Sequence, residues 1–209
     1  MLSSSGRGIT EAMLAPVTRA LVRRRVPATA VTVTGGALTV AITLALIPTG
    51  HLWIGALVLG VVVLVDSLDG QVARATGTVS PFGAFVDATT DRLVDGVLLG
   101  SIVVYALRHV PGEQGDALVV AALAALVADQ LVPYTKARGE AEGFAVGGGL
   151  AERADRLVLV LAGVLVHGLG APAWVLTTVL ALTALASLVT AGQRVAQVRA
   201  QARRSTEAS

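Results

Sequence analysis

The feature that most constrains this chain is a succession of apolar stretches, each about as long as a bilayer is thick. Of its 209 residues, 54% are hydrophobic and only 14% are charged, whereas a soluble domain carries about 25% charged residues. A transmembrane helix needs roughly 20 apolar residues, so about six such helices account for nearly the whole chain. The sequence therefore predicts an all-α integral membrane protein with little room for a soluble domain.

Short polar stretches rich in turn-forming residues separate six predicted transmembrane helices. These helices are expected at 29–47, 52–74, 82–107, 117–138, 151–169 and 173–198. Thr29 is the expected N-cap of the first, 111–115 is an expected outer loop, and 143–149 is an expected glycine-rich loop. Ahead of them, Ile9, Met13 and Val17 recur at roughly helical spacing among arginines, which predicts an amphipathic interfacial helix.

These elements are expected to form one membrane-embedded domain over residues 1–209. Its parts would be the amphipathic helix within 1–27, a six-helix core over 28–198 and a frayed polar tail over 199–209. The chain contains no cysteine, so thiol and disulfide chemistry are excluded.

Cationic residues are concentrated at alternate junctions between the predicted helices. Five arginines precede the first apolar stretch, four more follow the last predicted helix or lie at its end, and the cations between fall mainly at 74 and 136–156. At the other junctions Arg108 is the only lysine or arginine. The positive-inside rule then places both termini in the cytoplasm, which requires an even number of transmembrane helices. We expect a multi-pass protein of a bacterial cell membrane, and no nucleic-acid partner.

Four aspartates lie near the ends of the second and third predicted helices. Asp66 and Asp69 are three positions apart, and Asp87 and Asp91 are four apart, so each helix would present two carboxylates on one face. A carboxylate in or near a bilayer core costs at least a few kcal/mol and usually has a function. Two facing helices would thus offer a ring of oxygen ligands for a hard cation such as Mg²⁺, which commonly binds substrate phosphates as well.

The aspartates belong to a longer pattern, D-x2-D-G-x2-A-R-x8-G-x3-D-x3-D, with eight fixed positions over 26 residues. Its members are Asp66, Asp69, Gly70, Ala73, Arg74, Gly83, Asp87 and Asp91. The pattern resembles the signature of the CDP-alcohol phosphotransferase family at every fixed position. The alternative is that the aspartates are paired with cations for packing alone, but only Arg74 and Arg92 are close in sequence to balance them.

The resemblance implies an enzyme, a homodimer and a set of site residues. It implies that two Mg²⁺ ions, with Mn²⁺ as the alternative metal, are bound chiefly by Asp66, Asp69 and Asp87. Asp91 would contribute to one metal and act as the general base. The residues implied to contact CDP-diacylglycerol are Gly70, Ala73, Arg74 and Thr32. Thr32 lies in a segment similar to a family Asn/Asp-x2-Thr-x2-Gly pattern, although Thr29 stands where Asn or Asp is usual.

A second polar group lies at the end of the fourth predicted helix and the start of the fifth. We expect its cations to meet at the cytoplasmic surface beside the aspartates and to bind an acceptor phosphate; the alternative is that they only anchor the topology. The candidates are Lys136, Arg138, Arg153 and Arg156, with Arg194 from the sixth helix. Of the remaining buried charges, we expect Arg92 to pair with Asp95, and Asp129 to form a helix–helix hydrogen bond.

The segments Tyr134-x-Lys-Ala-Arg and Gly149-x2-Glu-Arg resemble the actinobacterial phosphatidylinositol phosphate synthases within the larger family, although Gly139-Glu140 replaces the Ala-Glu that commonly follows. The expected reaction transfers the phosphatidyl group of CDP-diacylglycerol to the hydroxyl of myo-inositol phosphate and releases CMP. Glycerol 3-phosphate is the alternative acceptor, as in phosphatidylglycerophosphate synthase. A divalent-cation transporter is the alternative from another class, because buried carboxylates also mark ion paths.

Overall fold

The protein is a bundle of antiparallel helices. The computed structural model describes residues 15–24, 26–66, 72–73, 80–150 and 152–207. Within these ranges the chain forms helices and no strand, and residues 15–23 are also helical. The main helices are α2 (Ala28–Leu46), α3 (Leu52–Asp66), α5 (Pro81–His109), α6 (Gly112–Ala141), α7 (Arg153–Gly168) and α8 (Ala173–Glu207). The all-α prediction is confirmed for the described residues.

Three of the helices are long and apolar enough to cross a membrane. They are Ala28–Leu46, Gly112–Ala141 and Ala173–Ser205, and Leu52–Val63 forms a shorter apolar helix. α5 is 29 residues long, but Asp87, Asp91, Arg92 and Asp95 lie in its first half. Its length suits a bilayer, whereas its charges require protein or water around that half.

The helices pack side by side around a core of small and branched side chains. α5 lies between α2 and α6, α6 packs along α8, and α7 packs against both α8 and α3. The buried face of α6 includes four alanines: Ala121, Ala122, Ala125 and Ala128. Small residues let neighbouring helices approach closely, which is how helices commonly associate in membranes. Gly36 of α2 does the same against α5, because a Cβ there would lie 2.2 Å from Thr90 Cγ2.

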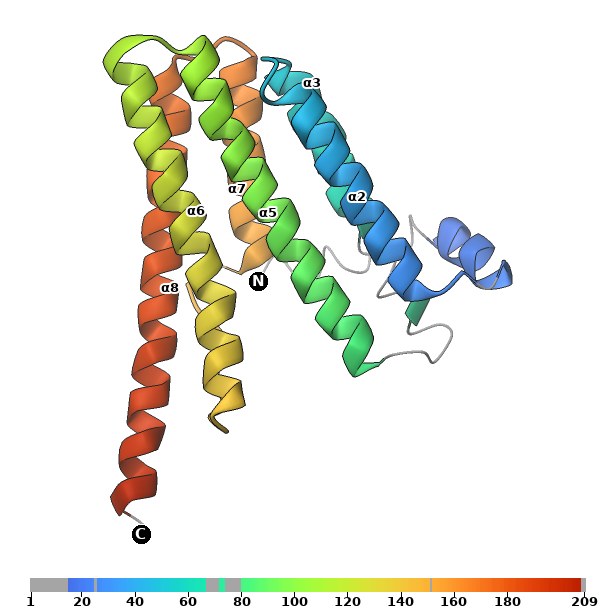
Figure 1. The fold of residues 1–209 in the computed structure, drawn as a ribbon, viewed down its shortest axis with the longest axis vertical. Helices are drawn as coiled ribbons and strands as arrows, with labels where there is room; N and C mark the ends of the chain where they lie inside the picture. Colours follow the sequence, from blue (N-terminus) through green and yellow to red (C-terminus); the bar gives the residue numbers. More distant parts are fainter. Residues whose placement is uncertain (1–14, 25, 67–71, 74–79, 151, 208–209) are drawn as a thin grey trace.

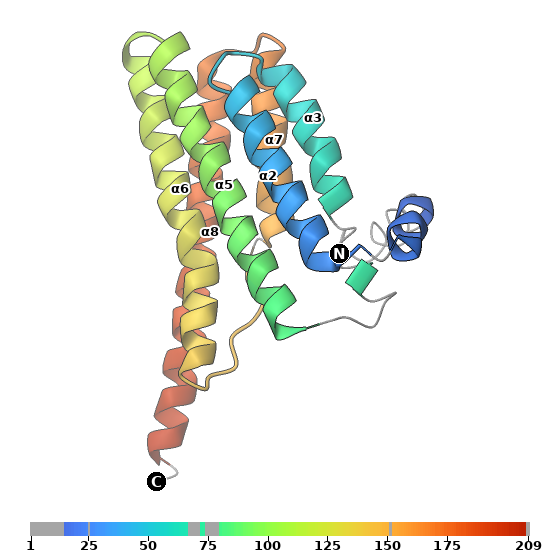
Figure 2. The same ribbon diagram turned by 45° about the vertical axis from the view of Figure 1, so that its right-hand side comes forward.

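The two ends of the bundle differ in construction. At one end, the upper one in Figure 1, short turns connect α2 to α3, α5 to α6 and α7 to α8; we call this the turn end. At the opposite end α7 begins part-way along the bundle, so α6 and α8 extend past it in both views (Figures 1 and 2). We call this second region, which holds Asp87, Asp91 and Arg153, the carboxylate end.

Three sequence predictions about helix ends are wrong. Thr29 is not an N-cap, because α2 begins at Ala28 and its N-cap is Pro27. The expected loop 111–115 is shorter, because α6 already begins at Gly112. The tail from Arg199 is not frayed, because α8 continues to Glu207. At 35 residues, α8 is about 52 Å long, well beyond the roughly 30 Å of a bilayer core.

Candidate functional site

A stripe of carboxylates on α5 runs from the carboxylate end into the bundle. The start of α5 is well defined, because Ser80 Oγ accepts a hydrogen bond from Gly83 N at 3.0 Å and Pro81 occupies the first turn. Asp87, Asp91 and Asp95 then follow at intervals of four residues on one face. Asp87 is exposed and Asp91 half-buried, whereas Asp95 retains only 6% of its accessible surface. The stripe therefore leads from solvent to the interior.

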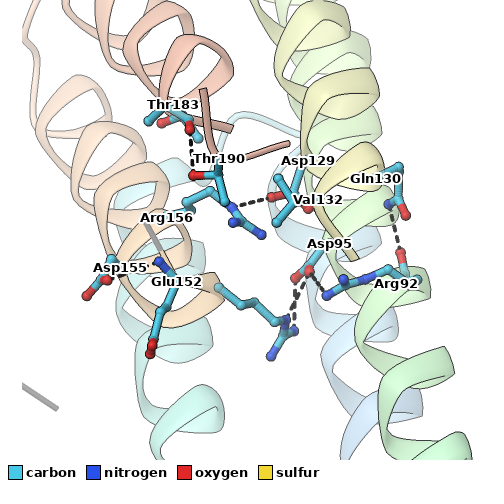
Figure 3. Close-up of polar contacts among 12 residues, drawn as sticks. Arg92, Asp95, Asp129, Gln130, Val132, Glu152, Asp155, Arg156, Thr183 and Thr190 are labelled. Atoms are coloured by element: carbon cyan, nitrogen blue, oxygen red, sulfur yellow. Dashed lines mark hydrogen bonds and ion pairs between the residues drawn. The ribbon is translucent and has the colours of Figure 1, made fainter. Parts of the chain in front are cut away.

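Arg153 joins the two inner carboxylates of this stripe. Its Nη1 lies 3.0 Å from Asp91 Oδ1, while its Nε and Nη2 donate to the two oxygens of Asp95, each at 2.9 Å. Arg92 adds a further bond, from Nη2 to Asp95 Oδ2 at 2.9 Å (Figure 3). The predicted pairing of Arg92 with Asp95 is confirmed, and Asp95 has a second cationic partner from α7.

Local structure at the start of α7 places Arg153 at this point. Glu152 is the N-cap and forms a capping box with Asp155, whose carboxylate accepts from the Glu152 backbone N–H at 3.2 Å. This reciprocal arrangement satisfies backbone donors that the first turn leaves without helical partners. Arg153 is thus the first residue of a capped helix that begins inside the bundle.

Two glutamines of α8 hold the segment that leads into α7. Gln201 donates to Ala145 O at 2.7 Å and accepts from Ala145 N at 3.0 Å. Gln197 makes the same two bonds with Gly147, at 3.0 and 3.3 Å. Each side-chain amide thereby pairs with a peptide group as another peptide would. Sequence reasoning missed both residues, because nothing in the local pattern of α8 marks them.

A second ion pair lies deeper and joins α6 to α7. Arg156 Nε donates to Asp129 Oδ1 at 2.7 Å, and the two side chains are only 4% and 7% exposed (Figure 3). The predicted helix–helix hydrogen bond of Asp129 is therefore confirmed. The two ion pairs and Thr183 line a small pocket that is partly open to solvent and whose remaining walls are apolar.

The structure does not gather the five predicted acceptor cations at one surface. Arg156 is buried rather than at the surface, so that expectation is wrong for this residue. Lys136 and Arg138 are exposed and pair with Glu140 and Glu142 on the same helix. Lys136 lies seven residues beyond Asp129 in the sequence, so it is about 10 Å further along α6 than the buried ion pair. Arg194 donates to the backbone carbonyl oxygens of Val132 and Gly148. Arg153 alone among the five contacts Asp91 in the described part of the chain.

Several predicted metal and nucleotide residues lie outside the described residues. They are Asp69, Gly70 and Arg74. Asp66 is the last residue of α3, and its side chain is not described. Thr32 is buried near the start of α2, where its hydroxyl donates a hydrogen bond to Ala28 O. Ala73 is half-buried.

The described ranges contain no group of three metal-binding side chains. What they do contain fits a hard cation, since Asp87 and Asp91 offer carboxylate oxygens one turn apart, and hard cations take oxygen ligands.

Comparison with known proteins decides the family. Residues 25–137 match the model of the CDP-alcohol phosphatidyltransferase family. The chain belongs to this family. Among its curated relatives, the phosphatidylinositol phosphate synthase of Corynebacterium glutamicum is 40% identical over 199 residues, covering 92% of this chain and 90% of the relative. That of Streptomyces avermitilis is 39% identical over 205 residues, covering 95% of this chain and 83% of the relative.

Solved structures of a family member are similar to the whole bundle. The phosphatidylinositol phosphate synthase of Mycobacterium tuberculosis is 38% identical, with a TM-score of 0.81 over 88% of this chain. One of its structures is in complex with manganese and citrate and covers 87% of that chain. Another has CDP-diacylglycerol bound and covers 92% of that chain. Membership of this enzyme family leaves no support for the transporter interpretation.

Proposed function

We propose that this chain transfers the phosphatidyl group of CDP-diacylglycerol to a hydroxyl group of inositol phosphate, yielding phosphatidylinositol phosphate and CMP. The observation that supports the proposal is the 3.0 Å contact between Arg153, the proposed cation for the acceptor phosphate, and Asp91, the proposed base. The curated relatives named above are synthases of this product, and a solved relative binds CDP-diacylglycerol.

In the proposed reaction, the acceptor hydroxyl oxygen attacks the phosphorus that carries the diacylglycerol. A new O–P bond forms as the bond from that phosphorus to the bridging oxygen of the diphosphate breaks, and CMP leaves with the electron pair. Asp91 accepts the hydroxyl proton, since it lies at the junction of the exposed and buried parts of the stripe. Arg153 holds the acceptor phosphate so that the hydroxyl is correctly placed.

The metal site is part of the proposal. Asp66, Asp69, Asp87 and Asp91 would hold two Mg²⁺ or Mn²⁺ ions, which when bound would neutralise the diphosphate charge and stabilise the leaving oxygen. Thr32, Gly70, Ala73 and Arg74 would contact the nucleotide. Of the other predicted acceptor cations, Lys136, Arg138 and Arg194 stay proposed members of the acceptor set, whereas Arg156 is held in its buried pair with Asp129. The contacts described above leave Arg153 as the central member of that set.

The fine architecture is also proposed. The six helices α2, α3, α5, α6, α7 and α8 would all cross a bacterial cell membrane as one domain, with the N-terminal helix in the interface. The carboxylate end would lie in the cytoplasm, and two copies would form a homodimer. Antiparallel packing of the six helices and the cationic junctions at one end support this arrangement. The test is labelling of single cysteines at Gly147 and Gln114, both exposed in a cysteine-free chain. An impermeant maleimide should reach Gly147→Cys only from the inside and Gln114→Cys only from the outside; the reverse pattern would overturn the orientation.

The reaction is tested with purified protein, CDP-diacylglycerol, Mg²⁺ and a panel of alcohols. Inositol phosphate should give CMP and lipid product, and free inositol should be a poor substitute because it leaves Arg153 without a phosphate partner. A faster reaction with glycerol 3-phosphate would refute the proposed acceptor while leaving the family reaction intact. Equal rates with free inositol would remove phosphate binding from the role of Arg153.

A further inference from the structure

We infer that Asp95, which lies outside the family signature, is a positioning residue that aims Arg153 at the acceptor phosphate. The inference rests on the proposed function and adds a specificity determinant to it. Its basis is the geometry of a single guanidinium group. Asp95 takes the Nε and Nη2 of Arg153 at 2.9 Å each, and Asp91 lies 3.0 Å from the remaining Nη1.

The two bonds to Asp95 determine the plane of the guanidinium group. A carboxylate that accepts two parallel N–H bonds defines both the position and the orientation of an arginine, which a single bond or a lysine cannot do. With its Nε and Nη2 edge on Asp95, Arg153 presents Nη1 toward Asp91. An acceptor phosphate that binds Nη1 is then next to the proposed base, while the two bonds to Asp95 remain in place.

Asp95 is itself held by a second cation, whose backbone is in turn bonded to α6. Arg92 donates from Nη2 to Asp95 Oδ2 at 2.9 Å, and the Arg92 carbonyl oxygen accepts from Gln130 Nε2 of α6 at 3.3 Å (Figure 3). The cluster thus contains two carboxylates, Asp91 and Asp95, and two guanidinium groups, those of Arg92 and Arg153. This balance matters because a buried charge that loses its partner is strongly destabilising.

A merely structural role for Asp95 predicts a different outcome from a positioning role. If Asp95 only stabilises the bundle, its replacement should reduce the amount of folded enzyme and so lower the maximum rate, without changing the KM for either substrate. If Asp95 positions Arg153, its replacement should raise the KM for the acceptor alone. The size of that rise should depend on the presence of Arg153. The experiment therefore measures the KM for each substrate separately and repeats the change in a second background.

The main variant is Asp95→Asn, which keeps the shape but removes the charge and one accepting oxygen. We expect the KM for inositol phosphate to rise about tenfold, as for loss of one charge-assisted hydrogen bond, with the KM for CDP-diacylglycerol within about twofold. In an Arg153→Lys background, which already lacks the guanidinium plane, Asp95→Asn should add less than about twofold. The matched control is Asp116→Asn, an exposed aspartate near the start of α6, which should change neither KM.

A second variant and a second readout keep the test decisive. Asp95→Glu retains the charge but displaces it by one methylene, so it should fold and still raise the KM for the acceptor several-fold. Stabilisation of the protein by inorganic phosphate, measured as the rise in Tm, should be smaller in both variants than in wild type. Equal rises in both KM values, full additivity with Arg153→Lys, or an unchanged acceptor KM in Asp95→Glu would each overturn the inference.

Failure of the inference is distinguishable from failure of the proposed function. If the wild-type protein forms no lipid product from inositol phosphate, the proposed acceptor is wrong, whatever Asp95 does. The same KM comparison then applies to glycerol 3-phosphate, since the role of Asp95 concerns the phosphate rather than the polyol. The Tm measurement with inorganic phosphate needs no turnover at all.

Discussion

The two ends of this bundle are held together by different chemistry. At the turn end the polar contacts join tyrosine and histidine side chains to each other or to the backbone: Tyr105 Oη lies 3.0 Å from His167 Nε2, and His109 Nε2 lies 3.1 Å from Pro48 O. At the carboxylate end the contacts are ion pairs between Asp91, Asp95, Arg92 and Arg153. The turn end thus connects the helices without ion pairs among the described contacts, whereas the carboxylate end contains ion pairs that are partly buried.

The difference raises the question of why the carboxylate end contains partly buried charges at all. Buried charges stabilise a fold no better than well-packed apolar residues do, and removal of one partner is costly. An end of the bundle that served only to close it would not need them. The turn end shows that this chain can close three connections without an ion pair among the described contacts. The charges of the carboxylate end are what the proposed substrate binding and proton transfer would require.

The largest expected effect is on turnover at the carboxylate end. Asp91→Asn should lower kcat by about 10²- to 10⁴-fold, the usual contribution of a general base, while CDP-diacylglycerol still binds. CMP release and equilibrium binding of the lipid substrate measure the two quantities. The same substitution at Asp116, near the turn end of α6, should leave both unchanged. A near-normal kcat in Asp91→Asn would remove the assignment of Asp91 as base.

The next largest effect concerns the buried pair between Arg156 and Asp129. Arg156→Leu leaves Asp129 buried without its cation, and should lower the free energy of unfolding in detergent by about 3–5 kcal/mol. The contrasting change is Arg138→Leu, which breaks an exposed pair with Glu142 and should cost at most about 1 kcal/mol. The double variant Asp129→Leu/Arg156→Leu should recover much of the loss. If the single change at Arg156 is no worse than that at Arg138, the buried pair is better hydrated than its burial indicates.

The fold was largely predictable because hydropathy detects lengths that match a bilayer. The predicted starts at Leu52 and Ala173 agree with α3 and α8, since turn residues precede both. The errors lie at the helix ends. Beyond Arg199 the composition is charged but rich in alanine, glutamine and arginine, all good helix formers. A criterion based on apolar length ends the helix there, although the backbone has no reason to stop.

The candidate site was predictable only where its partners are close in sequence. Intervals of four residues placed Asp87, Asp91 and Asp95 on one face, and an interval of three paired Arg92 with Asp95. The contact from Arg153 to Asp95 spans 58 residues and depends on how far inside the bundle α7 begins. No local pattern encodes that depth. Gathering cations by their nearness to a junction therefore grouped Arg156 with Lys136, although the fold separates them.

A smaller effect is expected where α8 holds the segment before α7. Gln197→Leu with Gln201→Leu removes the amide pairs to Ala145 and Gly147. Each lost hydrogen bond contributes about 0.5–1.5 kcal/mol, so hydrogen exchange at the amides of Ala145 and Gly147 should accelerate by about tenfold or more. The control is Gln193→Leu, which changes an exposed glutamine of the same helix. Unchanged exchange in the double variant would show that the segment is held by other contacts.

The smallest expected effect is at the turn end and concerns a single hydrogen bond between two side chains. Tyr105 Oη lies 3.0 Å from His167 Nε2. On the other side of the ring, His167 Nδ1 lies 2.6 Å from Ala171 O; a carbonyl oxygen only accepts, so Nδ1 carries a proton. Tyr105→Phe should lower the free energy of unfolding by about 1 kcal/mol and leave kcat and both KM values unchanged. Tyr134→Phe, at an exposed tyrosine, should cost less than about 0.5 kcal/mol. A loss of turnover in Tyr105→Phe without a matching loss of stability would contradict the separation of the two ends, because it would mean that the turn end takes part in the reaction.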